Sequence, residues 1–263
     1  MSLAAIDIAN EALLRLGEAT ISAGTAVTPN AAAVVDNSDG TVTLPATAHG
    51  ISAGRLVGIT GTTNYDGEYI LDSATAANTI VVTATYTAED LTSAARVTPL
   101  FDTTPNGVVC ERMYRNLRRR MLSAFPWGFA VGEEDLTEDT DQEDARWTYA
   151  FDLPADYLRA IDINGDETAE FEVLRAHLFC DADEVALRYL ASADDPADWP
   201  AWFRHALVLQ FAADLAMPVT GSADILTAMI TLAGEALREA KTADASENRG
   251  AVAVTRTIAD SRW

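Results

Sequence analysis

The side chains best suited to catalysis or metal binding are few in this sequence, apart from its carboxylates. The three histidines, His49, His177 and His205, lie in three different predicted elements, and none has a second His or Cys at metal-ligand spacing. The sequence contains no GxxxxGK[ST], GxGxxG or HExxH motif, and no GxSxG elbow between a strand and a helix. We therefore predict no catalytic residue, no metal site and no cofactor, and we do not expect an enzyme.

Carboxylates are abundant, but their number identifies no pair. The chain has 263 residues, with 40 Asp and Glu against 18 Lys and Arg and a net charge of -22. Residues 133–144 hold eight acids in twelve positions, yet no register starting at Asp135, Asp139 or Asp141 supplies both the glycine and the final glutamate of an EF-hand loop. We expect a solvated, mobile loop there. So acidic a chain is not a general nucleic-acid binder, because affinity for DNA comes mainly from neutralising phosphates.

The two cysteines, Cys110 and Cys180, are far apart in the sequence and fall at predicted core positions. Two cysteines do not make a disulfide framework, so we expect reduced, buried thiols. The longest apolar run, residues 206–217, is shorter than the roughly 18 to 20 residues of a membrane span. The N-terminal residues lack the basic and apolar regions of a secretory signal.

The strongest helical pattern covers residues 106–130 and combines an apolar stripe with a basic surface. The stripe consists of Val109, Met113, Leu117 and Met121, at intervals of four. The basic residues are Arg112, Arg115, Arg118, Arg119 and Arg120. Pro105 precedes this predicted helix and Pro126 ends it.

Two interpretations of this arginine surface remain open. In the first, the arginines are solvated and form helical ion pairs, such as Glu111 with Arg115 at i, i+4. In the second, they meet an acidic partner, either another copy of this acidic chain or a phosphate backbone.

The segment between residues 24 and 99 has a different composition from the rest. Thr, Val, Gly and Ala dominate, and the turn signals Asp39-Gly40 and Asp66-Gly67 separate short alternating runs. We predict an all-β barrel or sandwich of five or six strands, preceded by a helix over residues 4–17 that ends at Gly17. The stretch from residue 49 to 71 resembles a small β-module that decorates phage tail and capsid-associated proteins. Its tyrosines, Tyr65, Tyr69 and Tyr86, form either a sugar-binding surface or packing within the module.

After residue 130 the pattern alternates between short strands and apolar helices. Residues 147–190 predict a small antiparallel sheet, and two helices follow on either side of Pro218. The last helix has a predicted inner stripe of Leu226, Ile230, Ala233 and Leu237. From Lys241 onward the sequence predicts a flexible arm, 241–263, that ends in an apolar hook at Trp263.

The order of these elements resembles the head-tail connector adaptors of short-tailed bacteriophages, the tail tubular protein A-like family. Four motifs carry the resemblance: ANEALLRLG at 9–17, YRNLRRRMLSAFPWGFA at 114–130, YAFDLPADYLR at 149–159 and LVLQFAADLAMPVTGS at 207–222. The resemblance implies an α+β fold: an antiparallel four-helix bundle with a small antiparallel β-sheet subdomain, plus the inserted all-β module. The connector core would be 1–23 and 100–240, and the insert 24–99.

The resemblance also implies a structural role in the virion, at the head-tail junction, after assembly in the host cytoplasm. Family members form a twelve-fold ring beneath the portal protein, carry the tail nozzle and let double-stranded DNA pass through the lumen without sequence-specific binding. The five arginines would then lie at a subunit or portal interface, and an arm with Val254, Ile258 and Trp263 would dock on the portal. No membrane is implied. The alternative is a tail-associated binding module whose β-domain recognises a host glycan or another tail protein.

Overall fold

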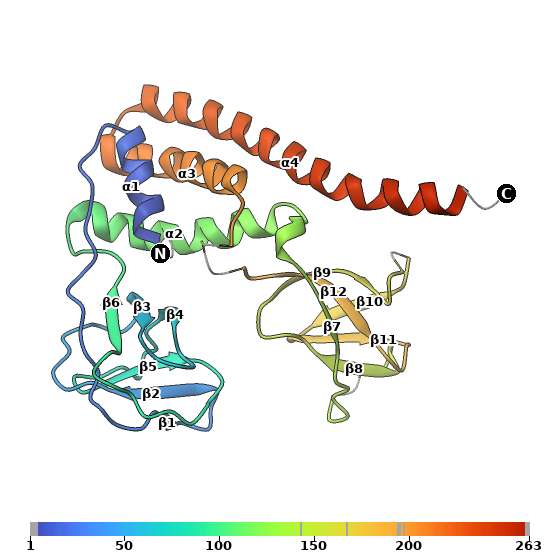
Figure 1. Ribbon diagram of the computed structural model, residues 1–263, viewed down its shortest axis with the longest axis horizontal. Coiled ribbons are helices and arrows are strands. Elements are labelled where there is room, and N and C mark those ends of the chain that lie inside the picture. Colours follow the sequence, from blue (N-terminus) through green and yellow to red (C-terminus); the bar gives the residue numbers. More distant parts are fainter. Residues whose placement is uncertain (1–4, 143, 167, 194–195, 197, 261–263) are drawn as a thin grey trace. The chain divides into compact units, whose positions relative to one another are not determined.

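The computed structural model describes residues 5–142, 144–166, 168–193, 196 and 198–260, with the backbone alone over residues 248–260. Within these residues the chain forms four α-helices and twelve β-strands, and the strands make four three-stranded antiparallel sheets (Figure 1). The predicted four-helix bundle with a small β-sheet subdomain is therefore wrong. Periodicity identifies single strands, but the number of sheets depends on pairings between distant segments, which periodicity does not report.

The chain divides into two compact units. The first comprises Met1–Leu117, Asp194–Ala197 and Arg204–Ala236, and the second Arg118–Ala193, Asp198–Phe203 and Leu237–Trp263. The boundary passes through three helices, α2 (Pro105–Ser123), α3 (Ala201–Leu215) and α4 (Ala223–Asp260). Both units therefore contain helix as well as sheet.

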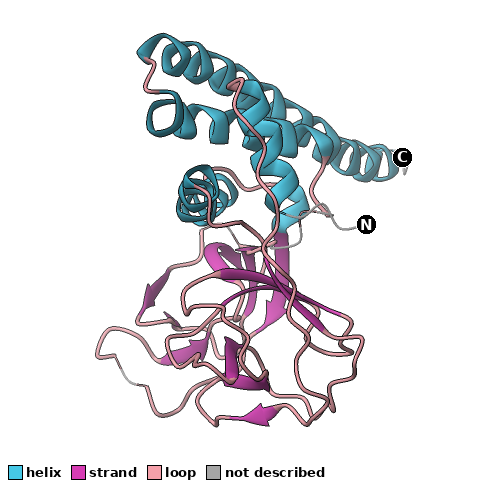
Figure 2. Cartoon of the chain, turned by 90° about the vertical axis from the view of Figure 1, so that its left-hand side faces the viewer, coloured by secondary structure: helices cyan, strands magenta, loops and turns pink. Residues whose placement is uncertain are grey.

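Six short strands of the first unit lie in the segment predicted to be all-β, so the expected five or six strands are confirmed. One sheet has the order β1-β2-β5 and the other β4-β3-β6, with short strands joined by loops (Figure 2). A shared apolar core includes Val42, Leu44, Ile59, Ile80 and Val97. The bounds are β1 (Val35–Asp36), β2 (Thr41–Pro45), β3 (Leu56–Thr60), β4 (Gly67–Ile70), β5 (Thr79–Thr83) and β6 (Arg96–Pro99).

The two ends of this β-module lie side by side. The Gly24 N–H donates to the Pro99 carbonyl at 2.8 Å, and Val27 forms an antiparallel bridge with Val97. One step further out, the Ser22 N–H donates to Asp102 Oδ2 at 2.9 Å. We call this ladder the stem of the module, since it joins the two ends of the segment that connects α1 (Ala5–Arg15) to α2.

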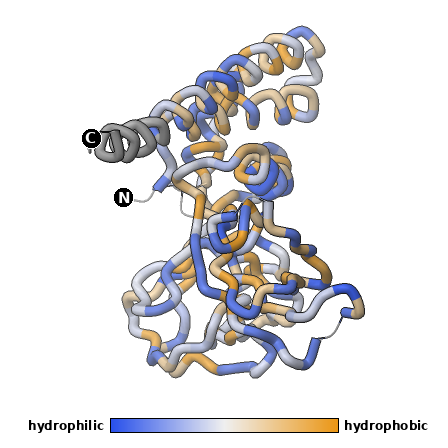
Figure 3. The backbone as a smooth tube through the Cα atoms, turned by 90° about the vertical axis from the view of Figure 1, so that its right-hand side faces the viewer, coloured by the Kyte–Doolittle hydropathy of each residue, from blue (hydrophilic) through white to orange (hydrophobic). Residues whose placement is uncertain are grey.

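Each helix of the first unit buries apolar side chains against the interior. The predicted first helix is confirmed as α1, and Gly17 takes a left-handed conformation just beyond its end, with φ 75°. The α2 helix buries Cys110, Tyr114 and Leu117. The α3 helix is buried on more than one side, as expected from its continuous apolar sequence. Figure 3 shows hydrophobic and hydrophilic residues mixed along these helices.

The second unit contains two sheets where the sequence predicts one. The orders are β7-β12-β9 and β10-β11-β8. Residues 131–135 form an edge strand, so the first part of the predicted solvated loop at 133–144 is in fact paired with β12. The bounds are β7 (Val131–Asp135), β8 (Tyr149–Asp152), β9 (Tyr157–Ile163), β10 (Phe171–Leu174), β11 (His177–Cys180) and β12 (Ala186–Ala191).

An aromatic cluster forms the helical side of the second unit. Trp127 is fully buried, its indole N–H donates to the Met121 carbonyl at 2.8 Å, and its ring lies 5.2 Å from that of Phe203. Phe129 stacks edge-on against Phe203 at 4.9 Å. The indole of Trp127 thus lies against the C-terminal end of α2. The α2 helix ends here because Pro126 cannot continue it.

The α4 helix differs from its prediction in two respects. It continues beyond Lys241, where the sequence predicts irregular chain, and reaches Asp260. Its buried stripe is Ala233, Ala236 and Ala240, whereas Ile230 is 56% exposed. Of the predicted inner stripe, Ala233 is buried, Leu226 and Leu237 are partly buried, and only Ile230 is exposed. No described helix has the length and apolarity needed to cross a bilayer.

Candidate functional site

Four members of the arginine surface of α2 are exposed, and three of them share one face of the helix. Arg112, Arg115 and Arg119 are exposed, and their i, i+3, i+7 spacing places them on one face of the helix. Among the described residues, none of the three has an ion-pair or hydrogen-bond partner. Arg118 and Arg120, in contrast, each have an interaction within the chain. We call Arg112, Arg115 and Arg119 the arginine stripe.

The predicted helical ion pair between Glu111 and Arg115 does not form, because Glu111 is used elsewhere. Its carboxylate lies 2.8 Å from Arg55 Nε and also accepts the Leu56 N–H at 2.7 Å. The two side chains are only 23% and 12% exposed, and the Arg55 guanidinium also donates to the Phe101 carbonyl. This partly buried pair fastens the β-module to α2 and leaves Arg115 available.

A hollow of about 460 Å³ lies beside this ion pair, within the first unit. Its wall is formed by residues 53–55 of the β-module and by one side of α2, from Val108 to Asn116. Three arginines and one glutamate line it: Arg55, Arg112, Arg115 and Glu111. Since Glu111 neutralises Arg55, the remaining positive charge comes from Arg112 and Arg115. Guanidinium groups bind carboxylates and phosphates through paired N–H donors, so this hollow suits an acidic partner.

Comparison with known proteins identifies no family for this chain. No protein-family model matches the chain, and no curated protein is similar to it.

The three tyrosines proposed as a sugar-binding surface do not share one. Tyr65 is 1% exposed, and its hydroxyl donates to the Thr87 carbonyl at 2.6 Å and accepts the Thr87 N–H at 2.8 Å. Tyr69 is half-buried against the core of the module, and Tyr86 is 42% exposed. Tyr65 is thus a core residue, and only Tyr86 stands out on the surface.

The predicted portal-docking residues fall at the end of the chain. Val254 and Ile258 lie within the span of α4, but their side chains are outside the described part. Trp263 also lies outside the described residues. Docking through this segment stays a prediction.

The cysteines and two of the histidines have structural roles or none. Both cysteines are free and buried, as predicted, and burial raises the pKa of the Cys110 thiol to about 12. His49 uses both ring nitrogens inside the β-module: one meets the Ala76 carbonyl at 2.5 Å, and the other accepts the Ile51 N–H at 3.1 Å. His205 is exposed on α3.

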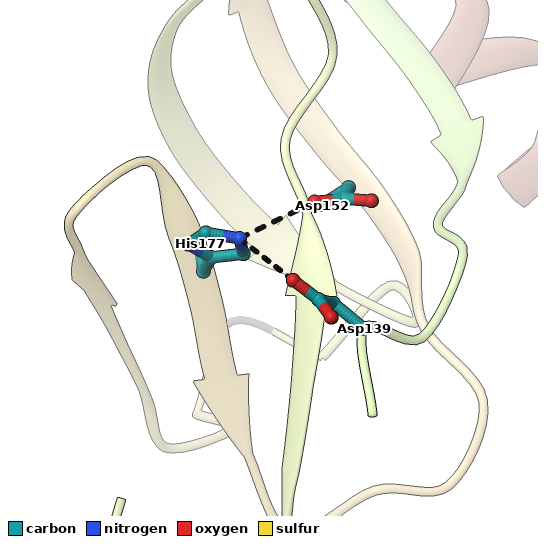
Figure 4. Close-up of side chains that lie close together, drawn as sticks. All are labelled: Asp139, Asp152 and His177. Carbon is teal, nitrogen blue, oxygen red and sulfur yellow. Dashed lines mark ion pairs between the residues drawn. The ribbon is translucent and has the colours of Figure 1, made fainter. Parts of the chain in front are cut away.

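The third histidine belongs to a cluster that the sequence did not reveal. In the second unit, His177 Nε2 lies 3.1 Å from Asp139 Oδ2 and 3.3 Å from Asp152 Oδ1 (Figure 4). The ligand atoms of all three residues lie within 4.8 Å of one another. The residues come from three separate segments, so no spacing motif marks them. If the pairing of the strand at 149–152 with the strand at 177–180 had been predicted, it would have brought Asp152 and His177 together.

Proposed function

We propose that this chain is a structural virion protein, a head-tail connector that assembles into a ring between the portal and the tail. The observation that carries the proposal is the arginine stripe: three exposed guanidinium groups with no described partner, on a chain of net charge -22. A cationic surface on so acidic a protein has its most abundant complement in other copies of the same chain. The resemblance in element order supports the same role.

A matching acidic surface exists on the same chain. Strand β7 is an edge of its sheet, and it exposes Glu133, Glu134 and Asp135. When two different faces of one subunit are complementary, the contact is heterologous, and it closes into a ring if the rotation permits. Charge complementarity of this kind also fixes the register between subunits and excludes wrong partners.

The remaining charge fits the passage of DNA through such a ring. Away from the arginine stripe the chain is strongly acidic, and an acidic lumen repels phosphate, so DNA slides without being held. The partners in this proposal are further copies of the chain, the portal protein and a tail nozzle or other tail protein. The double-stranded genome passes through without sequence-specific contact.

Charge reversal tests the proposed contact. We expect Arg112→Glu/Arg115→Glu to stay monomeric under conditions in which the wild-type chain assembles on the portal ring encoded in the same genome, as measured by native mass. The control is Arg15→Glu/Arg159→Glu, which changes the net charge equally at exposed positions on α1 and β9. This control should assemble normally. Rings of normal mass from the Arg112→Glu/Arg115→Glu chain would refute the role of the stripe.

A charge swap tests the proposed contact with β7 separately from the proposed connector function. Adding Glu133→Lys/Asp135→Lys to the Arg112→Glu/Arg115→Glu chain should restore assembly if β7 is the matching surface. If assembly is lost in the first variant and not restored, another acidic surface receives the arginines. If the wild-type chain itself ignores the portal, the connector role is wrong.

A further inference from the structure

We infer that Asp139, Asp152 and His177 form a binding site for a divalent transition-metal ion of the zinc type. This site lies wholly in the second unit and is independent of the arginine stripe. Three separate observations support the site: the strand pairing, the hydrogen bonding of the imidazole and the spacing of the ligand atoms.

Strand pairing brings the three side chains to one face. His177 is the direct cross-strand partner of Asp152 in the β8–β11 pair, so the two side chains point to the same side of the sheet. On the other edge of β8, the Asp139 N–H donates to the Ala150 carbonyl at 2.8 Å and the Asp152 N–H to the Thr137 carbonyl at 3.0 Å. Asp139 thus lies opposite Ala150, and because side chains alternate along a strand, it shares the face of Asp152.

The imidazole is oriented as metal-binding histidines are. His177 Nδ1 lies 3.0 Å from the Arg175 carbonyl, which can only accept, so this nitrogen carries a proton. Nε2 faces two carboxylates, which are acceptors only. These three groups are satisfied either by a proton on Nε2 or by a cation between them, and a metal ion would bind in place of that proton. Donation of the second ring N–H to a backbone carbonyl is the usual support of a metal-bound histidine.

The turn that supplies this carbonyl is conformationally costly. Arg175 and Ala176 both have positive φ, 51° and 68°, in the two-residue turn between β10 and β11. Non-glycine residues seldom adopt this conformation. The turn nonetheless holds the Arg175 carbonyl against the ring and so fixes the direction of Nε2.

The spacing fits a first-row metal. Two ligands of a tetrahedral zinc ion lie roughly 3.3 Å apart when the bonds are about 2.0–2.1 Å long. The observed separations from Nε2, 3.1 and 3.3 Å, are close to that edge length. Two carboxylates neutralise a 2+ ion, and the imidazole favours zinc over calcium or magnesium, which prefer oxygen. Water would complete the coordination shell at Asp152, which is 64% exposed.

Metal binding would fasten the acidic segment after β7 to the sheet. Asp139 lies in that segment, whereas Asp152 and His177 belong to paired strands. The ion would therefore stabilise the second unit.

The test measures zinc bound to the full-length chain at equilibrium, together with the thermal midpoint with and without zinc. We expect one high-affinity zinc per chain and a raised midpoint. His177→Gln and Asp139→Asn should each weaken zinc binding by about 100-fold and abolish the shift in midpoint. The matched controls, His205→Gln and Asp183→Asn, change exposed residues outside the cluster and should bind zinc as the wild-type chain does.

Two results would overturn the site. One is zinc binding that survives in both cluster variants, and the other is calcium competing with zinc at equal concentration, as a diffuse acidic surface would allow. Far-UV circular dichroism of each variant without metal establishes that it is folded. If His177→Gln or Asp139→Asn does not fold, Asp152→Asn takes its place, because it changes the most exposed of the three ligands. This variant must still lose the zinc-induced shift in thermal midpoint.

Discussion

Two helical glycines of this chain have opposite surroundings. Gly107 lies in the first turn of α2, where an added Cβ would meet the backbone oxygen of Asp102 at 2.6 Å. Gly234 lies in α4, and an added Cβ there meets nothing within 4 Å. The first glycine is therefore required by a close backbone approach, and the second is not.

We expect Gly107→Ala and Gly234→Ala to change stability in opposite directions. Gly107→Ala should lower the free energy of unfolding by about 1–3 kcal/mol, because the backbone must move to admit the methyl group. Gly234→Ala should raise it by about 0.5–1 kcal/mol, because alanine favours the helix. Urea unfolding of the two variants measures both. A stabilised Gly107→Ala protein would mean that this approach is looser than described.

At the residue scale, sequence patterns predicted chemical character better than location. The exposed arginines and the buried thiols follow from helical period and charge. Tyr65 could not be placed, because an aromatic ring suits a binding surface and a core equally well until its hydroxyl is seen to bond Thr87. The His177 cluster could not be predicted either, since it depends on which strands pair.

At the scale of elements, the start of α2 is tied to the stem of the β-module through Asp102. Thr104 caps the helix, its hydroxyl accepting the Gly107 N–H at 3.2 Å. Asp102 accepts from the Ser22 N–H and from both the N–H and the hydroxyl of Thr104. Burial alone would raise the pKa of Asp102, but these hydrogen bonds, with the charge of Arg55, hold it below its usual value.

A lowered pKa gives Asp102 a defined effect on acid stability. Its contribution is present above the pKa of the unfolded chain, near 3.9, and is lost as the pH falls through the lower folded value. We expect Asp102→Asn to be less stable than wild type by about 1 kcal/mol at pH 7, with the difference shrinking below pH 4. Urea midpoints from pH 7 to pH 3 provide the measurement.

The control for this experiment is Asp90→Asn, which removes an exposed carboxylate of the same module. Its difference from wild type should stay small throughout the pH range. A constant deficit for Asp102→Asn at every pH would show that the carboxylate acts by shape alone and not through its charge.

Elements were predicted more reliably than their assembly. The helices and the six strands of the β-module follow from period and turn residues, which are local properties. Strand β7 was missed because its acidic residues resemble a solvated loop, and only pairing with β12 makes it a strand. The four sheets, and hence the fold, depend on such non-local pairings.

At the scale of the whole molecule, three helices run through both compact units. The helices α2, α3 and α4 each cross the boundary between the units. If one unit unfolded, the part of each helix that it contains would unfold, and the same helices would be interrupted in the other unit. The two units should therefore unfold in one cooperative transition.

This prediction can be measured with two signals. Trp127, Trp147, Trp199 and Trp202 all belong to the second unit, so in a Trp263→Phe background the tryptophan fluorescence reports on that unit. Far-UV circular dichroism reports on both. We expect the two urea midpoints to coincide. A fluorescence transition separated from the dichroism transition would show that the units unfold independently.

The stem of the β-module has an evolutionary consequence. Because Gly24 and Pro99 meet through a hydrogen bond of 2.8 Å, the 24–99 segment starts and finishes at nearly the same point of the chain. A gene could gain, lose or exchange such a segment by a single in-frame event, with a replacement of about three residues bridging the gap. Related genomes are then expected to differ here in whole modules rather than in scattered substitutions.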